Sequence, residues 1–132
     1  MNINSIQDEI IEDFSRLDGW FDKYEYLINA GASLHGMEEN LKTEDNQING
    51  CQSQVWLFAE QAEDRVYFTA DSEALITRGI LALLLRVLNG QLRQDIEECD
   101  LYFIERTGLG SNLSPGRANG LASIVKRIKQ LD

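Results

Sequence analysis

Hydrophobic residues near the N-terminus recur every three to four positions, the spacing of amphipathic helices. They form two stripes: Ile6, Ile10, Phe14 and Leu17, then Trp20, Tyr24, Leu27 and Ile28. Asn4 with Gln7 resembles a capping box, and Asp18 and Gly19 separate the stripes, with Asp18 placed to cap the second helix. Gly31 is placed to end that helix. We expect two helices that form an antiparallel pair.

The hydrophobic period then changes from that of a helix to that of a strand. Apolar and other side chains alternate over residues 55–60 and again over residues 66–70, and a short polar connection lies between them. This pattern predicts an antiparallel hairpin. A short third strand that starts at Ile48 is left open.

The helical period returns after the hairpin. Asp71 is a candidate N-cap, and Glu73 lies near the positive end of the expected helix dipole. Residues 74–88 are apolar on most sides, which predicts the central buried helix of the fold. Asn89 and Gly90 end it.

The C-terminal part contains shorter helical segments and one longer helix. Residues 91–98 and 101–106 have helical patterns, and residues 108–111 read as a loop. Ser114 and Pro115 fit the N-cap and first position of a last helix. Its apolar stripe is Leu121, Ile124, Val125, Ile128 and Leu131. The order indicates an α+β fold of two layers, with a small antiparallel sheet packed against N- and C-terminal helices.

Length and composition favour a single domain, residues 1–132, with 43% hydrophobic and 26% charged residues. The net charge of −10, from 22 acidic and 12 basic residues, disfavours nucleic acid or an anionic membrane as a partner. We find no secretory signal and no apolar run of bilayer length. These features predict a cytoplasmic protein in which Cys51 and Cys99 are free thiols.

Few side chains suit catalysis. The single histidine, His35, has no cysteine near it in the sequence, so we expect no metal site. Cys99 lies among Glu97, Glu98 and Asp100, whose negative charge disfavours a thiolate. We interpret Cys99 as a structural thiol.

Cys51 has a different setting, where a polar segment enters the first strand. Gly50 permits backbone conformations that a β-carbon would prevent, and Gln52, Ser53 and Gln54 add polar groups without negative charge. A nucleophile and a small core residue both fit such a position. The residue types alone therefore leave the role of Cys51 open.

Residues 50–57, GCQSQVWL, are similar to the signature GCQSQVW of one known family, the SufE sulfur acceptors. Residues 70–76, ADSEALI, resemble its (A/G)DSDA stretch, and residues 113–121, LSPGRANGL, resemble its L(S/T)PSRxxGL stretch. The N-terminal helices are also similar, so the likeness covers roughly residues 6–131.

The resemblance implies that Cys51 accepts sulfane sulfur as a persulfide from a PLP-dependent cysteine desulfurase and stimulates that enzyme. The sulfur then passes to the iron–sulfur assembly scaffold or to another acceptor. It also implies that PLP belongs to the partner, that the carrier itself holds no cofactor, and that the Cys51 loop shelters the thiol and swings out for transfer. The supporting or partner-facing residues implied are Gly50, Gln52, Ser53, Gln54, Asp71, Glu73 and Arg117.

The chain departs from the family pattern at Glu73, where aspartate is usual, and at Gly116, where serine is usual. Arg117 stands at the start of the last helix, where the dipole disfavours a cation, so it has either a tertiary task or a salt bridge. Two alternatives to sulfur transfer also stay open. One is a thiol peroxidase or redox sensor, with Cys99 as the candidate resolving cysteine. The other is a module that docks on a desulfurase without transferring sulfur.

Overall fold

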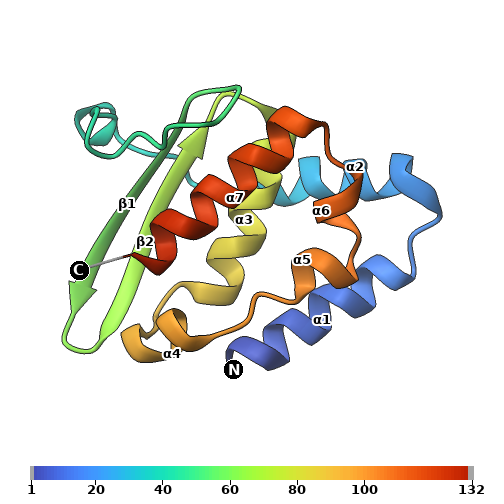
Figure 1. Ribbon diagram of the computed structural model, residues 1–132, viewed down its shortest axis with the longest axis horizontal. Coiled ribbons are helices and arrows are strands. Elements are labelled where there is room, and N and C mark those ends of the chain that lie inside the picture. The colour runs from blue at the N-terminus through green and yellow to red at the C-terminus, as the bar shows by residue number, and fades with distance from the viewer. Residues whose placement is uncertain (1, 131–132) are drawn as a thin grey trace.

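The computed structural model describes residues 2–130, which form the predicted α+β fold (Figure 1). Helices precede and follow a small antiparallel sheet. The elements in chain order are α1 (Ile3–Ser15), α2 (Gly19–Ala32), the 3-10 turn η1 (Glu39–Leu41), β1 (Val55–Ala62), β2 (Arg65–Ser72), α3 (Leu75–Leu88), β3 (Gln91–Leu92), α4 (Arg93–Glu98), α5 (Phe103–Arg106), α6 (Leu109–Asn112) and α7 (Pro115–Lys129). No helix within residues 2–130 is both long and apolar enough to cross a bilayer.

The sheet has the order β1-β2-β3. The predicted hairpin is confirmed, since β1 and β2 pair along their full length, from Val55 opposite Ser72 to Ala62 opposite Arg65. The third strand is β3, on the far side of β2, and not a strand at Ile48. The segment before Ile48 contributes only an isolated bridge, between Gln47 and Trp56.

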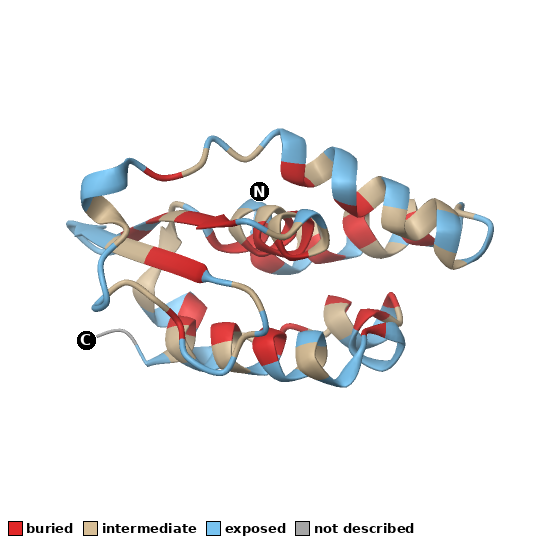
Figure 2. Cartoon of the chain, turned by 90° about the horizontal axis from the view of Figure 1, so that it is seen from above, coloured by how far each residue is buried: buried red, intermediate tan, exposed pale blue. Residues whose placement is uncertain are grey.

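The helix α3 is the centre of the core, as its apolar sequence predicts. Its buried residues include Ile80, Leu81, Leu83, Leu84, Val87 and Leu88. Figure 2, in which α3 is seen nearly end-on, shows α2 on one side of it and α7 on the other. Most of the buried positions in that view line the space between these layers. The functional site described below lies between α3 and α7.

The helix α2 packs chiefly on α3, and two glycines set this contact. A β-carbon on Gly79 would lie 2.2 Å from the carbonyl oxygen of Leu27, and one on Gly31 would lie 2.8 Å from the backbone nitrogen of Gly79. The helix α2 ends at Ala32, one residue after the predicted end at Gly31, and Gly31 itself permits the close approach of α3. Contact with α1 is smaller and includes the rings of Phe14 and Tyr26, whose centroids are 4.9 Å apart.

Several helix ends differ from the sequence-based predictions. The N-cap of α1 is Asn2, whose side chain accepts a hydrogen bond from the backbone N–H of Ser5 at 2.7 Å. Asn4 lies inside the helix, and Gln7 is fully buried, donating to the carbonyl of Asp100 and accepting from the N–H of Phe103 at the start of α5. Residues 108–111 contain most of the short helix α6 instead of forming an open loop.

The start of α7 agrees with prediction. The hydroxyl oxygen of Ser114 accepts from the backbone N–H of Arg117 at 3.4 Å, and Pro115 occupies the first helical position. Leu121, Ile124 and Ile128 are buried along the predicted stripe, whereas Leu131 lies outside the described residues.

Candidate functional site

Cys51 lies near the tip of a loop whose two ends are joined by backbone hydrogen bonds. The N–H of Ile48 donates to the carbonyl of Val55, and the N–H of Leu57 donates to that of Asn46, each at 2.8 Å. Ile48 is also 5% exposed and belongs to the core. Ile48 is thus an anchor, and the Cys51 loop is defined here as residues 49–54.

The chain that leads into the Cys51 loop is also tied to α7. The guanidinium of Arg127 donates to the carbonyl oxygens of Asp45 and Gln47. Arginine presents several donors in a fixed geometry, which suits it to holding two backbone carbonyls at once. The N-terminal side of the Cys51 loop is therefore fixed relative to the helix that the loop faces.

Small residues of α7 allow the loop to approach closely. A β-carbon on Gly120 would lie 3.2 Å from Sγ of Cys51, and that Sγ lies 3.7 Å from the carbonyl oxygen of Gly120. Gly50 has a left-handed φ of 92°, and a β-carbon on it would lie 2.7 Å from Oγ of Ser123. Glycine at position 50 is thus required for both its backbone conformation and its close contact.

Beside the thiol is a cavity of about 140 Å³ between the Cys51 loop, the start of α3 and α7. Its wall is partly apolar, and its lining includes Cys51, Gln52, Thr77, Ile80, Arg117 and Leu121. Cys51 is half-buried, and this burial raises the pKa of its thiol, because a thiolate is less well solvated there than in water. At neutral pH the free protein therefore holds Cys51 mainly as the thiol.

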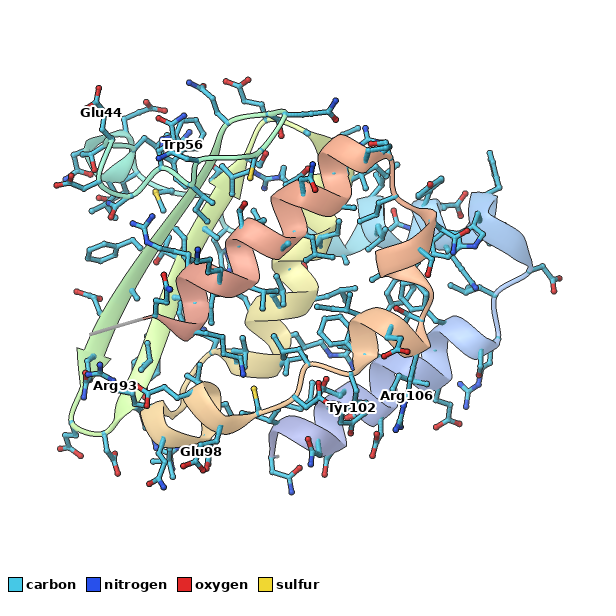
Figure 3. The ribbon with its side chains drawn as sticks, in the orientation of Figure 1. Glu44, Trp56, Arg93, Glu98, Tyr102 and Arg106 are labelled. Atoms are coloured by element: carbon cyan, nitrogen blue, oxygen red, sulfur yellow. The ribbon has the colours of Figure 1, made fainter. Side chains whose placement is uncertain are left out.

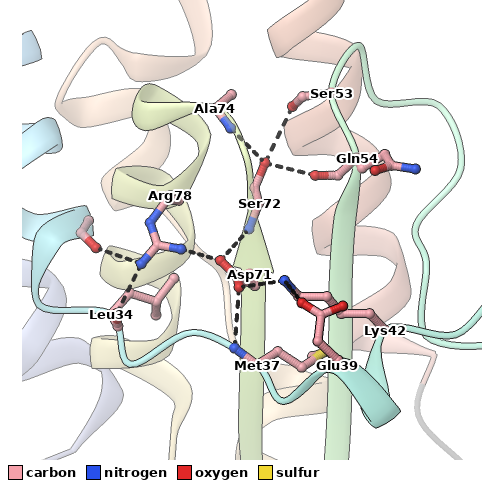
Figure 4. Close-up of polar contacts among 11 residues, drawn as sticks. Leu34, Met37, Glu39, Lys42, Ser53, Gln54, Asp71, Ser72, Ala74 and Arg78 are labelled. Carbon is pink, nitrogen blue, oxygen red and sulfur yellow. Dashed lines mark hydrogen bonds and ion pairs between the residues drawn. The ribbon is translucent and has the colours of Figure 1, made fainter.

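The C-terminal side of the Cys51 loop is fixed by Ser72, at the end of β2 (Figure 4). The hydroxyl of Ser72 donates to the carbonyl of Gln54 at 2.8 Å and accepts from the N–H of Ala74 at 3.3 Å. It also lies 3.4 Å from the hydroxyl of Ser53. One buried side chain thus joins the loop to the start of α3.

Asp71 is not the N-cap that the sequence suggested. It pairs with Trp56 in the sheet, and α3 begins at Leu75 with Ala74 as its N-cap. The Asp71 carboxylate is buried and forms an ion pair with Arg78, which also donates to the carbonyl of Leu34 at 3.0 Å. Asp71 thus stabilises the junction of β2 and α3 and does not line the cavity.

The same carboxylate fixes the segment between α2 and β1. It accepts from the N–H of Met37 at 3.2 Å and lies 3.4 Å from Nζ of Lys42 (Figure 4). The Lys42 ammonium is also 5.1 Å from the centroid of the Trp56 ring. Trp56 lies near the segment that carries Glu44 (Figure 3).

The remaining predicted residues lie at the surface around the cavity. Arg117 is exposed and lines the cavity. Its guanidinium forms no ion pair within residues 2–130, so the structure does not support the salt-bridge alternative for this residue. Glu73 is exposed at the junction of β2 and α3, and the side chain of Gln54 is also exposed. The structure thus brings Gln52, Ser53 and Arg117 to the cavity and leaves Asp71, Glu73 and Gln54 outside it.

Cys99 lies in a different part of the molecule, near the end of α7. Its Sγ is 3.3 Å from the carbonyl oxygen of Ile96 and 3.4 Å from Nζ of Lys129. Lys129 is distant from Cys99 in the chain, so its ammonium group could not be predicted as a neighbour from the acidic residues around Cys99. Cys51 contacts Gly120, whereas Cys99 lies beside Lys129, nine residues later in α7, and the two thiols line different cavities. Both are free.

No group of three or more His, Cys, Asp and Glu side chains suited to a metal ion occurs in the described part of the chain. His35 is exposed in the segment after α2. No role was predicted for Ser72, Gly120 or Ser123, although the first two fall within motif segments. Their roles depend on contacts across the fold, which no local pattern reports.

Comparison with known proteins gives consistent matches. The model of the family described as "SufE: Fe-S metabolism associated domain" matches residues 8–132. An uncharacterized SufE-like protein of Rhizobium etli is 41% identical over 128 residues, which cover 93% of this chain and 86% of the relative. Another, of Rhizobium meliloti, is 42% identical over 127 residues, covering 92% and 91%. A third, of Synechocystis sp., is 38% identical over 121 residues, covering 92% and 76%.

The fold also matches a solved structure. The solution structure of a hypothetical protein from Thermus thermophilus aligns with a TM-score of 0.76 and 19% identity, covering 94% of this chain and 90% of that one. At this identity the match supports the fold alone.

The Asp71 ion pair predicts a large effect on stability. Asp71→Ala leaves the largely buried guanidinium of Arg78 unpaired, which should lower the free energy of unfolding by about 3 kcal/mol. The control is Glu12→Ala, which removes the exposed pair with Arg16 and should cost less than about 0.5 kcal/mol. Urea unfolding measures both. Equal midpoints for the two variants would contradict the assigned role of Asp71.

The burial of Cys51 predicts an unusual pH dependence of its alkylation. In a Cys99→Ala background, the rate should rise with pH through a midpoint above that of the same thiol in the urea-unfolded chain, because burial raises the folded pKa. Below both midpoints each pH unit should change the rate about tenfold. The midpoint reports protonation and is independent of how easily the reagent enters. A folded midpoint at or below the unfolded one would show that burial does not control this thiol.

Proposed function

The chain belongs to the SufE family, associated with Fe–S metabolism, and we propose on that premise that it is a sulfur carrier whose acceptor is Cys51. The observation that carries the proposal is the position of the Cys51 thiol beside a cavity between the loop and α7. A cavity of about 140 Å³ has room for one further sulfur atom on the thiol. Shelter of this kind suits a persulfide, which small cellular thiols reduce when it is exposed.

The transfer step is an exchange at sulfur. The Cys51 thiolate attacks the outer sulfur of a donor persulfide, a new S–S bond forms on Cys51, and the donor cysteine leaves as a thiolate. No net oxidation or reduction occurs, because one S–S bond replaces another. The proton of the Cys51 thiol passes to solvent or to the departing donor thiolate.

The raised pKa of Cys51 makes deprotonation part of the mechanism. Movement of the Cys51 loop out of the cavity would restore solvation of the thiolate and lower this pKa. Arg117, which lines the cavity, is the candidate residue to offset the negative charge of a thiolate or persulfide there. In the free protein, then, burial keeps the thiol unreactive until a partner draws the loop outward.

The proposed donor is a PLP-dependent cysteine desulfurase, whose activity the chain would stimulate by removing its persulfide sulfur. The cofactor belongs to that partner, and the carrier's step needs only a thiol. Glu73 and Arg117 are exposed near the cavity, so we assign them to the surface that the donor approaches. The sulfur would then go to an iron–sulfur scaffold or another acceptor, in the cytoplasm.

The alternatives differ in what they require. A redox sensor or peroxidase with an internal disulfide needs a resolving thiol near Cys51, and Cys99 lies beside Lys129 and lines a different cavity. That separation disfavours this mechanism. A module that docks on a desulfurase without accepting sulfur needs no thiol at all, so removal of the Cys51 thiol separates it from a carrier.

Substitution of the two cysteines provides the test. Cys51→Ser should abolish stimulation of sulfide release by a cysteine desulfurase, because serine cannot form a persulfide, while circular dichroism stays unchanged. The matched control is Cys99→Ala, which should alter stimulation by much less than about tenfold, or ~1.4 kcal/mol in barrier. Stimulation retained by Cys51→Ser would instead favour the non-transferring module.

A further inference from the structure

The contact between Gln52 and Gly116 lies beside the Cys51 thiol. A β-carbon on Gly116 would lie 2.2 Å from Cδ of Gln52, 2.5 Å from its Cγ and 2.6 Å from its Nε2. The Gln52 side chain thus occupies the space that any other residue at position 116 would fill. Both residues also line the cavity that the thiol faces.

Nothing else within residues 2–130 requires glycine at position 116. Gly116 lies in the first turn of α7 and is absent from the residues with positive φ, so any residue could adopt its backbone conformation. Glycine is also among the least favourable residues within a helix. Room for the Gln52 side chain is therefore the one structural purpose that glycine serves there.

The contact between Gln52 and Gly116 is one of a row of contacts between the Cys51 loop and α7. Gly50 packs on Ser123, Cys51 on Gly120 and Gln52 on Gly116, so three successive loop residues contact one face of α7. The contacts with Ser123 and Gly120 are made by Gly50 and Cys51, which are close to the anchor at Ile48. The contact with Gly116 is made by Gln52, which follows Cys51 and is farther from that anchor.

We propose that Gln52 is a cover for Cys51, held closed by its contact with Gly116, and that this contact regulates how readily small molecules reach the thiol or its sulfur. The inference rests on the proposed function for its purpose, since a sulfur carrier needs protection from cellular thiols. Its physical basis is independent of that function. Loss of the Gln52 contact removes one of the contacts that hold the loop on α7 and shifts the loop toward the open state.

The test measures alkylation of Cys51 by iodoacetamide in a Cys99→Ala background, where Cys51 is the sole thiol. Gln52→Ala removes the cover, and Gly116→Ser excludes it by filling its place with the residue usual in the family pattern. Because the displaced atoms belong to a flexible surface side chain, Gly116→Ser should fold normally, and its urea midpoint checks this. The control is Gly110→Ala, whose β-carbon would meet Ile104 at an ordinary 3.5 Å, away from the site.

We expect each single variant to be alkylated about fivefold faster than the parent, and the double variant no faster than either, because both changes remove the same contact. Gly110→Ala should match the parent. Alkylation rates within about twofold of the parent for both single variants would overturn the proposal. So would a double variant whose rate increase equals the product of the two single increases.

A second measurement separates this inference from the proposed function. Cys51 is first loaded by a desulfurase with cysteine, and the loss of its sulfur to glutathione is then followed by mass spectrometry. The persulfide should be lost faster from Gln52→Ala and Gly116→Ser than from the parent, and equal rates would overturn the cover. A parent that takes up no sulfur would overturn the proposed function, and the alkylation rates would still decide the cover.

Discussion

The close approach of the Cys51 loop to α7 is the contact on which the site depends. The thiol lies 3.7 Å from the carbonyl oxygen of Gly120, and the absence of a side chain on Gly120 permits this close approach. The loop reaches this position because its ends are fixed, by Ile48 against Val55 on one side and by Ser72 on the other. The remaining helices and the sheet hold α7 and the β2–α3 junction in place around this contact.

The contact explains why the thiol is protected. Burial keeps Cys51 protonated, and an uncharged thiol in a partly apolar cavity reacts slowly with oxidants and electrophiles. In the proposed transfer only residues 49–53 would need to move to expose it, since hydrogen bonds hold Ile48 and Gln54 in place. So short a segment would lose little conformational entropy when it closes again.

The sequence predicted the features that depend on neighbouring residues. The hairpin, the central helix and the Ser114 cap of the last helix follow from period and capping, and the structure contains each. The motif resemblance selected Cys51, which composition alone left as either a nucleophile or a core residue. Local pattern was less exact at helix ends, since the N-cap of α1 is Asn2 and not Asn4, and residues 108–111 contain most of α6.

Features that depend on contacts distant in the chain were not predictable in this way. Asp71 reads as a helix cap, but pairing with β1 extends the strand through it and its carboxylate binds Arg78 instead. Gly31 reads only as a helix end, but it is also a point of contact with α3. Cys99 reads as a thiol among acids, yet Lys129 lies beside it. In each case the partner is more than five residues away.

Peptide mass spectrometry tests most directly whether Cys51 binds sulfur from a desulfurase. The parent protein is incubated with cysteine and a catalytic amount of a PLP-loaded cysteine desulfurase, the thiols are alkylated, and the peptides that contain Cys51 and Cys99 are analysed separately. The account predicts one added sulfur atom on the Cys51 peptide, removable by dithiothreitol, and none on the Cys99 peptide. An unmodified Cys51 peptide, or sulfur found on Cys99 instead, would contradict it.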